Sequence, residues 1–236
     1  MQERYLTLYR CTFDYMTNAE RFIFAYIELF SRSGKECGAS QQYIAERLHI
    51  TEITVLRSTR SLASAGFIFV RRSGKRKERN AYTVNRAKLH EMLTAWKRAN
   101  KDRPHKMPDA LRIPESFIAS FGANTKCLLV ANLYQLQTAG QTKGGMLADG
   151  VQYSQQALSE QCGCTRPSMC SALRDLESAG IIESGESNMQ WKKARRCYVL
   201  DLARIPQDGK AEPVAPQPVA FGADISGIDW DCEKPF

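Results

Sequence analysis

The run SQQALSEQCGCTRPSMCSALRDLESAGII, from Ser154 to Ile182, repeats a stretch that has already occurred in the chain. The earlier copy, SQQYIAERLHITEITVLRSTRSLASAGFI, extends from Ser40 to Ile68. When the two runs are aligned without a gap, the identical pairs are Ser40/Ser154, Gln41/Gln155, Gln42/Gln156, Glu46/Glu160, Thr51/Thr165, Arg60/Arg174, Leu62/Leu176, Ser64/Ser178, Ala65/Ala179, Gly66/Gly180 and Ile68/Ile182. The chain therefore carries one structural unit twice.

The repeated unit predicts two helices joined by a turn. Ser40 is a typical N-cap for a short helix over 41–48, in which apolar residues recur at helical spacing. Residues 49–51 then form a turn, and Thr51 caps a second helix that runs to Ala65. Gly66 supplies the C-terminal stop. In the other copy Ser154, Thr165 and Gly180 take the same three places.

The segments around each copy complete a longer series. Thr17 and Glu20 are spaced as a capping box and predict a preceding helix over 18–32, ended by Gly34. After the first copy, FIFVRRSGKRKERNAYTVN predicts a strand, a basic loop and a second strand. The second half repeats this plan with a helix over 124–137 and the strands IIESGE and RCYVLDL around the loop SNMQWKKARR. GGMLADGVQY, which precedes the second copy, predicts a loop with a short strand.

This order resembles the winged helix-turn-helix of bacterial DNA-binding domains. The runs YIAERLHITEITVLRSTRSLASAGFI and ALSEQCGCTRPSMCSALRDLESAGII carry the resemblance. It implies a mainly α fold with small β wings (α+β), in which two tandem winged helix-turn-helix domains precede a flexible C-terminal tail. We expect domain 1 over 1–93, a basic linker over 94–110, domain 2 over 111–204 and an acidic tail over 205–236.

The N-terminal lead RYLTLYRCTFDYMTNAERFIFAYI looks like the opening of the replication initiators of plasmids and phages. Some families of these initiators carry two winged helices in tandem. The resemblance implies origin recognition for a plasmid, phage or other mobile element. A transcriptional regulator that binds a promoter operator, or a protein-interaction scaffold, are the alternatives that the winged module also allows.

Charge points to the same partner. The 236 residues carry a formal net charge of +8, although the stretch 206–236 is acidic, so the body is more basic than the whole. A basic body attracts polyanions, and double-stranded DNA is the partner that we expect. The chain has no apolar run of about 18 residues, and Met1 is not followed by a signal peptide, which predicts a cytoplasmic protein without a membrane partner.

The sequence lacks the usual signs of catalysis and of cofactor binding. Its eight cysteines follow no disulfide framework, and the cluster of Cys162, Cys164 and Cys170 lacks a nearby histidine, so we expect reduced thiols and no metal. The run GQTKGG at Gly140 lacks the spacing of a phosphate-binding loop. We expect a protein that is not an enzyme, needs no cofactor and works as a monomer or homodimer.

In a winged helix the second helix of each repeated unit enters the major groove. Arg166 is the best candidate for a guanine, because its planar fork can bond O6 and N7 together. The candidate DNA-binding residues of the second unit are Thr165, Arg166, Ser168, Ser171 and Arg174. Those of the first unit are Thr51, Glu52, Thr54, Arg57 and Arg60.

The first unit departs from the usual pattern because Ile53 and Leu56 lie among its outward positions. These side chains can meet thymine methyl groups, and Glu52 can accept from a cytosine amine. Alternatively, this face packs on another protein or on the other domain.

Basic runs occupy the same loop in both copies, which predicts contacts to phosphate or to the minor groove. They comprise Arg71, Arg72, Lys75, Arg76, Lys77 and Arg79 in the first half and Lys192, Lys193, Arg195 and Arg196 in the second. The linker is also basic, with Lys97, Arg98, Lys101, Arg103 and Lys106. It is either a solvated connection or a segment that lies along the duplex.

The tail ends in GADISGIDWDCEKPF, where apolar and acidic residues alternate. Its final Pro-Phe is similar to the tips of bacterial single-stranded DNA-binding proteins, which dock replication and repair partners. That resemblance implies a docking peptide for replication machinery, a helicase or its loader; the alternative is a tail that folds back on the basic body and competes with DNA. The candidate docking residues are Ile225, Ile228, Trp230 and Phe236.

Overall fold

The computed structural model describes residues 5–71, 80–101, 108–142, 151–152, 154–186 and 196–205. These residues are mostly helical, with small antiparallel sheets. The first half contains β1 (Tyr5–Tyr9), the short 3-10 helix η1 (Arg10–Thr12), α1 (Asn18–Arg32), α2 (Gln41–Leu48), α3 (Glu52–Ser64), β2 (Ile68–Arg71), β3 (Ala81–Val84) and α4 (Arg86–Ala99). The second half contains β4 (Ala110–Pro114), α5 (Glu115–Phe121), α6 (Thr125–Thr142), β5 (Val151–Gln152), α7 (Gln155–Cys162), α8 (Arg166–Ser178), β6 (Ile182–Glu186), β7 (Arg196–Leu200) and η2 (Leu202–Arg204).

The helices of both repeated units are confirmed, together with their caps. The side chains of Ser40 and Ser154 accept backbone N–H bonds at the starts of α2 and α7. Thr51 and Thr165 do the same for α3 and α8, and the capping box of Thr17 is present at α1. The helix expected over 124–137 is longer in the structure, where α6 extends to Thr142.

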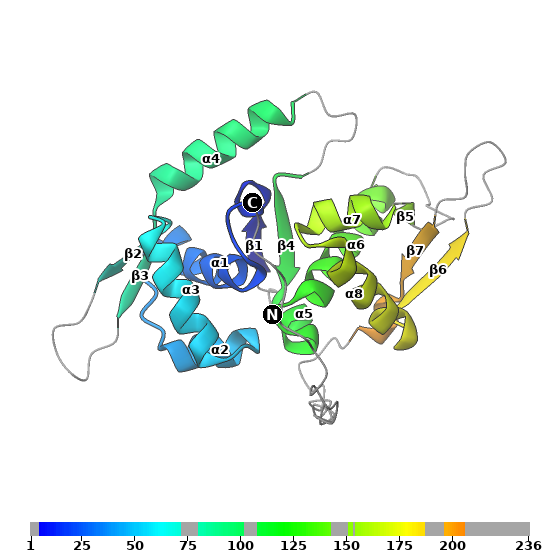
Figure 1. Ribbon diagram of the computed structural model, residues 1–236, viewed down its shortest axis with the longest axis horizontal. Helices are drawn as coiled ribbons and strands as arrows, with labels where there is room; N and C mark the ends of the chain where they lie inside the picture. Colours follow the sequence, from blue (N-terminus) through cyan, green and yellow to red (C-terminus); the bar gives the residue numbers. More distant parts are fainter. Residues whose placement is uncertain are drawn as a thin grey trace, which may run out of the picture.

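Four elements at the openings of the two halves were not predicted: β1 and η1 in the first half, and β4 and α5 in the second. Strands β1 and β4 form a two-stranded antiparallel sheet of their own, with Thr7 opposite Arg112 at its centre. Figure 1 shows this sheet between the two halves. A strand from the expected domain 1 is thus paired with a strand from the expected domain 2.

The two strands are antiparallel and of equal length, with Tyr5 opposite Pro114 and Tyr9 opposite Ala110. A local twofold axis through the centre of the sheet therefore exchanges one strand with the other. The side chains of the first residues of α1 and α6, Asn18 and Thr125, also meet, with Nδ2 to Oγ1 at 3.2 Å. When equivalent residues contact one another, the two units are related by a twofold operation. The two halves therefore contact one another about an approximate twofold axis.

Contacts further from this axis follow the same relation. Glu115, the first residue of α5, pairs with Arg47 of α2 at 2.7 Å. At the equivalent place Arg10, the first residue of η1, donates to the backbone oxygen of Gln161 in α7. One continuous apolar core runs through both halves and includes Leu6, Leu8, Leu111 and Ile113 of the central sheet.

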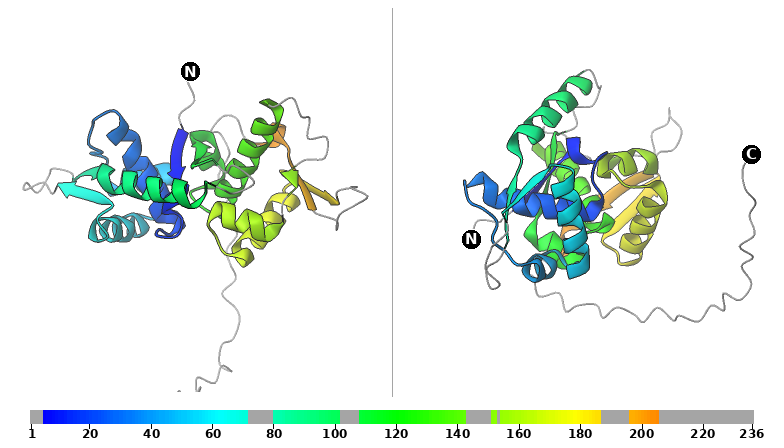
Figure 2. Two further views of the ribbon diagram at one scale, coloured as in Figure 1. Left: turned by 90° about the horizontal axis from the view of Figure 1, so that it is seen from above. Right: turned by 60° about the vertical axis from the view of Figure 1, so that its left-hand side comes forward.

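The outer elements lie at the two ends of the molecule. The ribbon β2–β3 and the three-stranded sheet β5–β7–β6 point outward at opposite ends in Figures 1 and 2. Helices α3 and α8 both lie on the side that faces the viewer in Figure 1. Within the described part of the chain, no helix has the length and apolar character that a membrane crossing requires.

The turns between the paired helices share one backbone conformation. His49 follows α2 with φ 52°, and Gly163 follows α7 with φ 59°, so both lie in the left-handed region. Their surroundings differ, because a Cβ on Gly163 would lie 2.6 Å from Cδ2 of Phe13 and 2.9 Å from Nη1 of Arg21. Glycine is required at 163 by this close approach of the other half, since the backbone shape alone is tolerated by His49.

We predict that Gly163→Ala destabilises the protein by about 2–4 kcal/mol, because left-handed strain adds to a steric clash between the halves. Urea unfolding followed by circular dichroism measures the change. The matched control is Gly34→Ala, where φ is 70° but nothing lies within 4 Å of the new Cβ. That substitution should cost only about 1 kcal/mol. Equal losses would mean that the contact of Phe13 with the turn contributes nothing.

Candidate nucleic-acid interface

The candidate residues of the second unit gather on the outer face of α8. Its inward stripe is buried and consists of Met169, Ala172, Leu173 and Leu176. The expected contact residues are exposed at the capped N-terminus and along the helix, namely Thr165, Arg166, Ser168, Ser171 and Arg174. The helix N-terminus adds a partial positive charge at this end, so the face suits an anionic ligand.

Helix α3 presents the same positions with different chemistry. Val55, Ser58, Thr59 and Leu62 form the predicted inner stripe and are buried. Outside it, Thr51, Glu52, Arg57 and Arg60 are exposed, and Thr54 is half-buried. Ile53 is 62 % exposed, so the departure seen in the sequence is a real apolar feature of this surface.

The caps of the two helices use their hydroxyl groups in the same way. Thr51 Oγ1 accepts from the N–H of Thr54, and the two hydroxyls lie 2.8 Å apart. Thr165 and Ser168 repeat this arrangement with their hydroxyls at 2.9 Å. The hydroxyls of these candidate DNA-binding residues therefore also hold the first turn of each helix.

Most residues of the basic loops lie outside the described part of the chain: Arg72, Lys75, Arg76, Lys77, Arg79, Lys192, Lys193 and Arg195, together with the side chain of Arg196. Arg71, at the end of β2, forms an exposed ion pair with Glu36. The hydrogen bond from Arg71 lowers the pKa of Glu36. The predicted docking residues Ile225, Ile228, Trp230 and Phe236 also lie outside the described residues.

The linker begins as a helix, because α4 continues through Ala99 into the expected range 94–110. Lys97 pairs with Asp109 at 3.1 Å, so this lysine connects the two ends of the linker. Arg98 and Lys101 are exposed, whereas Arg103 and Lys106 lie outside the described residues.

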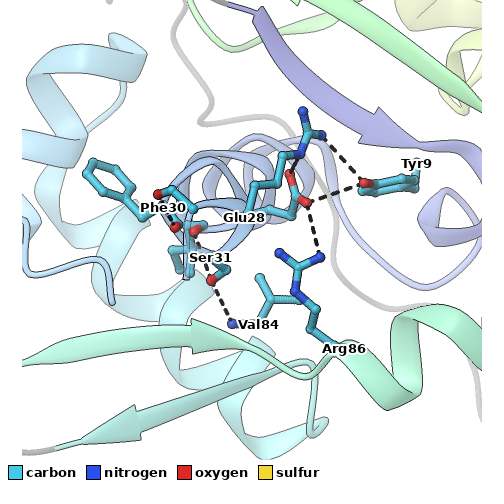
Figure 3. Close-up of polar contacts among 9 residues, drawn as sticks. Tyr9, Glu28, Phe30, Ser31, Val84 and Arg86 are labelled. Atoms are coloured by element: carbon cyan, nitrogen blue, oxygen red, sulfur yellow. Dashed lines mark hydrogen bonds and ion pairs between the residues drawn. The ribbon is translucent and has the colours of Figure 1, made fainter. Parts of the chain in front are cut away.

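A buried carboxylate holds the start of α4. Glu28 of α1 is 1 % exposed and pairs with Arg32 at 2.6 Å and with Arg86 of α4 at 3.9 Å. Tyr9 of β1 donates its hydroxyl to the same carboxylate at 3.3 Å (Figure 3). Burial and the charge of Glu28 raise the pKa of Tyr9, which keeps this phenol protonated and able to donate. The cluster thereby joins strand β1 of the central sheet, α1 and α4.

Two buried arginines at the contact between the halves were missed by sequence reasoning. Arg10 donates through Nε to the backbone oxygen of Pro108 at 3.0 Å and through Nη2 to Asn132 Oδ1 at 2.9 Å. Arg21 donates to the backbone oxygen of Cys162 at 3.2 Å, and its guanidinium lies 4.5 Å from the ring centroid of Phe13. An arginine that stands among apolar residues in the sequence is only a weak signal of a buried arginine, because most arginines in proteins are exposed.

Six cysteines are free, namely Cys11, Cys37, Cys127, Cys162, Cys164 and Cys170. Burial raises the pKa of Cys11 to about 11 and that of Cys162 to about 12, so both thiols are protonated at neutral pH. Among the described residues, no group of three or more His, Cys, Asp or Glu side chains is arranged to hold a metal ion.

A groove separates α3 from the ribbon β2–β3. It has a volume of about 690 Å³, and Phe69, 58 % exposed, lines it. The alternation of apolar residues in this strand predicted two faces but could not show that Phe69 faces outward. The remaining lining residues are Gln41, Leu56, Thr59, Arg60, Ala63, Ser64, Ile68, Val70, Asn80 and Tyr82.

No protein-family model matches the chain, and no curated protein matches it significantly.

We predict that Arg10→Ala destabilises the protein by about 3–5 kcal/mol, because the loss of a buried charged donor leaves Asn132 and two backbone oxygens without it. Urea unfolding at neutral pH measures the loss. Arg112→Ala removes an exposed arginine from the adjacent strand β4 and should change stability by about 0.5 kcal/mol or less. If both variants unfold at the same urea concentration as the parent chain, the contact between the halves does not depend on Arg10.

Proposed function

We propose that each half is a winged helix and that the chain binds double-stranded DNA in a sequence-specific manner. The observation that carries the proposal is the presence of two equivalent capped helices, α3 and α8, on one side of the molecule, each following a shorter helix and a left-handed turn. An α-helix fits the major groove. The hairpins beside these helices are the wings.

The approximate twofold relation between the halves supports a site with two inverted half-sites. Two recognition helices related in this way meet two successive major-groove faces in opposite directions. The half-sites would then lie about 10 base pairs apart and run in opposite orientations. Their sequences would differ, because Arg166 of α8 is replaced by Glu52 at the same position of α3.

Origin recognition is the biological role that we propose. It rests on the resemblance of the N-terminal lead to replication initiators and on the tandem layout. The sequence shows no phosphate-binding motif of the Walker type, so an initiator of this kind would recruit a helicase or its loader, and the C-terminal tail is the proposed docking segment for it.

A nuclease footprint on the DNA around the chain's own gene tests this role. Protection of several tandem repeats beside an A·T-rich stretch is the result expected for an initiator. A single protected palindrome over a promoter would indicate a transcriptional regulator instead. Absence of any specific protection would contradict DNA recognition and favour a protein-interaction scaffold.

We predict that Arg166→Ala weakens binding to the protected site by about 5- to 150-fold, because a bidentate contact to guanine contributes about 1–3 kcal/mol of discrimination. The variant should also lose its preference at one base position. Binding titrations against the site and against single-base variants measure both effects.

The control is Arg112→Ala, an exposed arginine that belongs to neither α3 nor α8. It should leave affinity for the site within about twofold of the parent chain. Affinity of the parent chain should also fall steeply between 50 and 200 mM salt, because bound phosphates release counterions. Affinity that does not change with salt would contradict contacts to the DNA backbone.

A further inference from the structure

The groove between α3 and the ribbon β2–β3 is lined by both apolar and polar side chains. Its apolar lining includes the buried Ile68, the half-buried Leu56 and the exposed Phe69. Ile53 lies one helical turn before Leu56 on the same face of α3. This surface therefore combines a hollow with two of the most exposed large apolar side chains among the described residues.

The second half shows that the fold does not need these apolar residues. Under the alignment of the two copies, Glu183 of β6 takes the position of Phe69, and Glu177 of α8 takes that of Ala63. Pro167 and Cys170 replace Ile53 and Leu56. The same elements thus form with acidic or small side chains at these positions, so forming these elements does not by itself require exposed apolar residues there.

Cations border the groove. Arg60 lines it, and Arg57 lies one turn earlier on the exposed part of α3. Neither arginine forms an ion pair within the described part of the chain. Glu52, an acid at the first turn of α3, lines a neighbouring hollow that shares Gln41, Asn80 and Tyr82 with the groove. A ligand for this surface should therefore carry apolar side chains together with negative charge.

The C-terminal sequence of this chain has that composition. Residues 222–236 contain Ile225, Ile228, Trp230 and Phe236, interleaved with Asp224, Asp229, Asp231 and Glu233. The 16 residues 206–221 connect Ile205 to this segment and can span about 55 Å when extended. That length exceeds the roughly 40–50 Å width of a compact body of 200 residues, so the segment can reach the groove from Ile205.

We propose that the groove between α3 and the ribbon β2–β3 binds residues 222–236 of the same chain. Trp230 or Phe236 enters the apolar hollow, and the neighbouring carboxylates pair with Arg57 and Arg60. A consequence that rests on the proposed function is that DNA and the segment exclude one another at α3. Binding to DNA would then release the segment for a partner.

The test measures docking without DNA. The full chain carries Trp230→Ala and Phe236→Ala, so that its own segment does not compete, and a fluorescent peptide of residues 222–236 is titrated under reducing conditions. Saturable binding by anisotropy is expected. Adding Phe69→Glu, the residue found at the same position of the second half, should weaken binding at least tenfold, and Arg60→Glu should do the same.

Arg174→Glu is the matched control, because Arg174 occupies the position of Arg60 in the second copy. It should leave peptide affinity within twofold, and circular dichroism should show that all variants are folded. Equal losses for Arg60→Glu and Arg174→Glu, or equal affinity for a peptide of scrambled order, would reduce the effect to general charge attraction and overturn the assignment. Absence of saturable binding would also overturn it.

Two further outcomes separate this inference from others. If the parent chain is a dimer and Phe69→Glu converts it into a monomer, the groove binds a second copy of the chain, and the assignment to residues 222–236 is wrong. The peptide titration contains no nucleic acid, so failure of the footprint leaves it intact, and failure of the titration leaves the DNA proposal intact.

Discussion

The pairing of β1 with β4 is the constraint on which the arrangement of the molecule depends. It joins residues 5–9 to residues 110–114 in a register that treats the halves as equals. Neither strand has another partner strand among the described residues, so each half supplies the pairing that the other lacks. The contacts of Asn18 with Thr125 and of Arg47 with Glu115 then align the first helices and the repeated units around the same axis.

Equivalent elements of the two halves carry different side chains, and these side chains differ at positions where the neighbouring residues also differ. His49 and Gly163 share a left-handed turn, but only Gly163 has the ring of Phe13 against it. Phe69 and Glu183 share a strand position, and Phe69 borders the groove beside α3. The repeated framework thus carries different chemistry on its two equivalent exposed faces.

Local features of the fold could be predicted from the sequence, and contacts between distant segments could not. Thr17, Ser40, Thr51, Ser154 and Thr165 were identified as caps because a cap depends on residues within one helical turn of it. Strands β1 and β4 were missed because each is short and is stabilised by a partner about a hundred residues away. Arg10 and Arg21 were missed for a similar reason, since their burial results from the approach of the other half.

The candidate site divides in the same way. The exposed faces of α3 and α8 followed from helical spacing, and the structure finds their inner stripes buried as expected. The groove beside Phe69 could not be predicted, because its prediction requires the position of the ribbon β2–β3 relative to α3. Helical spacing within 52–64 and strand alternation within 67–71 cannot show how far apart two elements will pack.

The central sheet also sets an order for synthesis and folding. During translation β1 is made first, but its partner emerges only after residue 114 has left the ribosome, and closing a loop of about a hundred residues is slow and entropically costly. Until then the first half carries an unpaired strand edge, which is a template for pairing with another nascent chain. A ribosome that pauses after β4 has emerged would therefore give β1 time to pair with β4 before it pairs with a strand of another nascent chain.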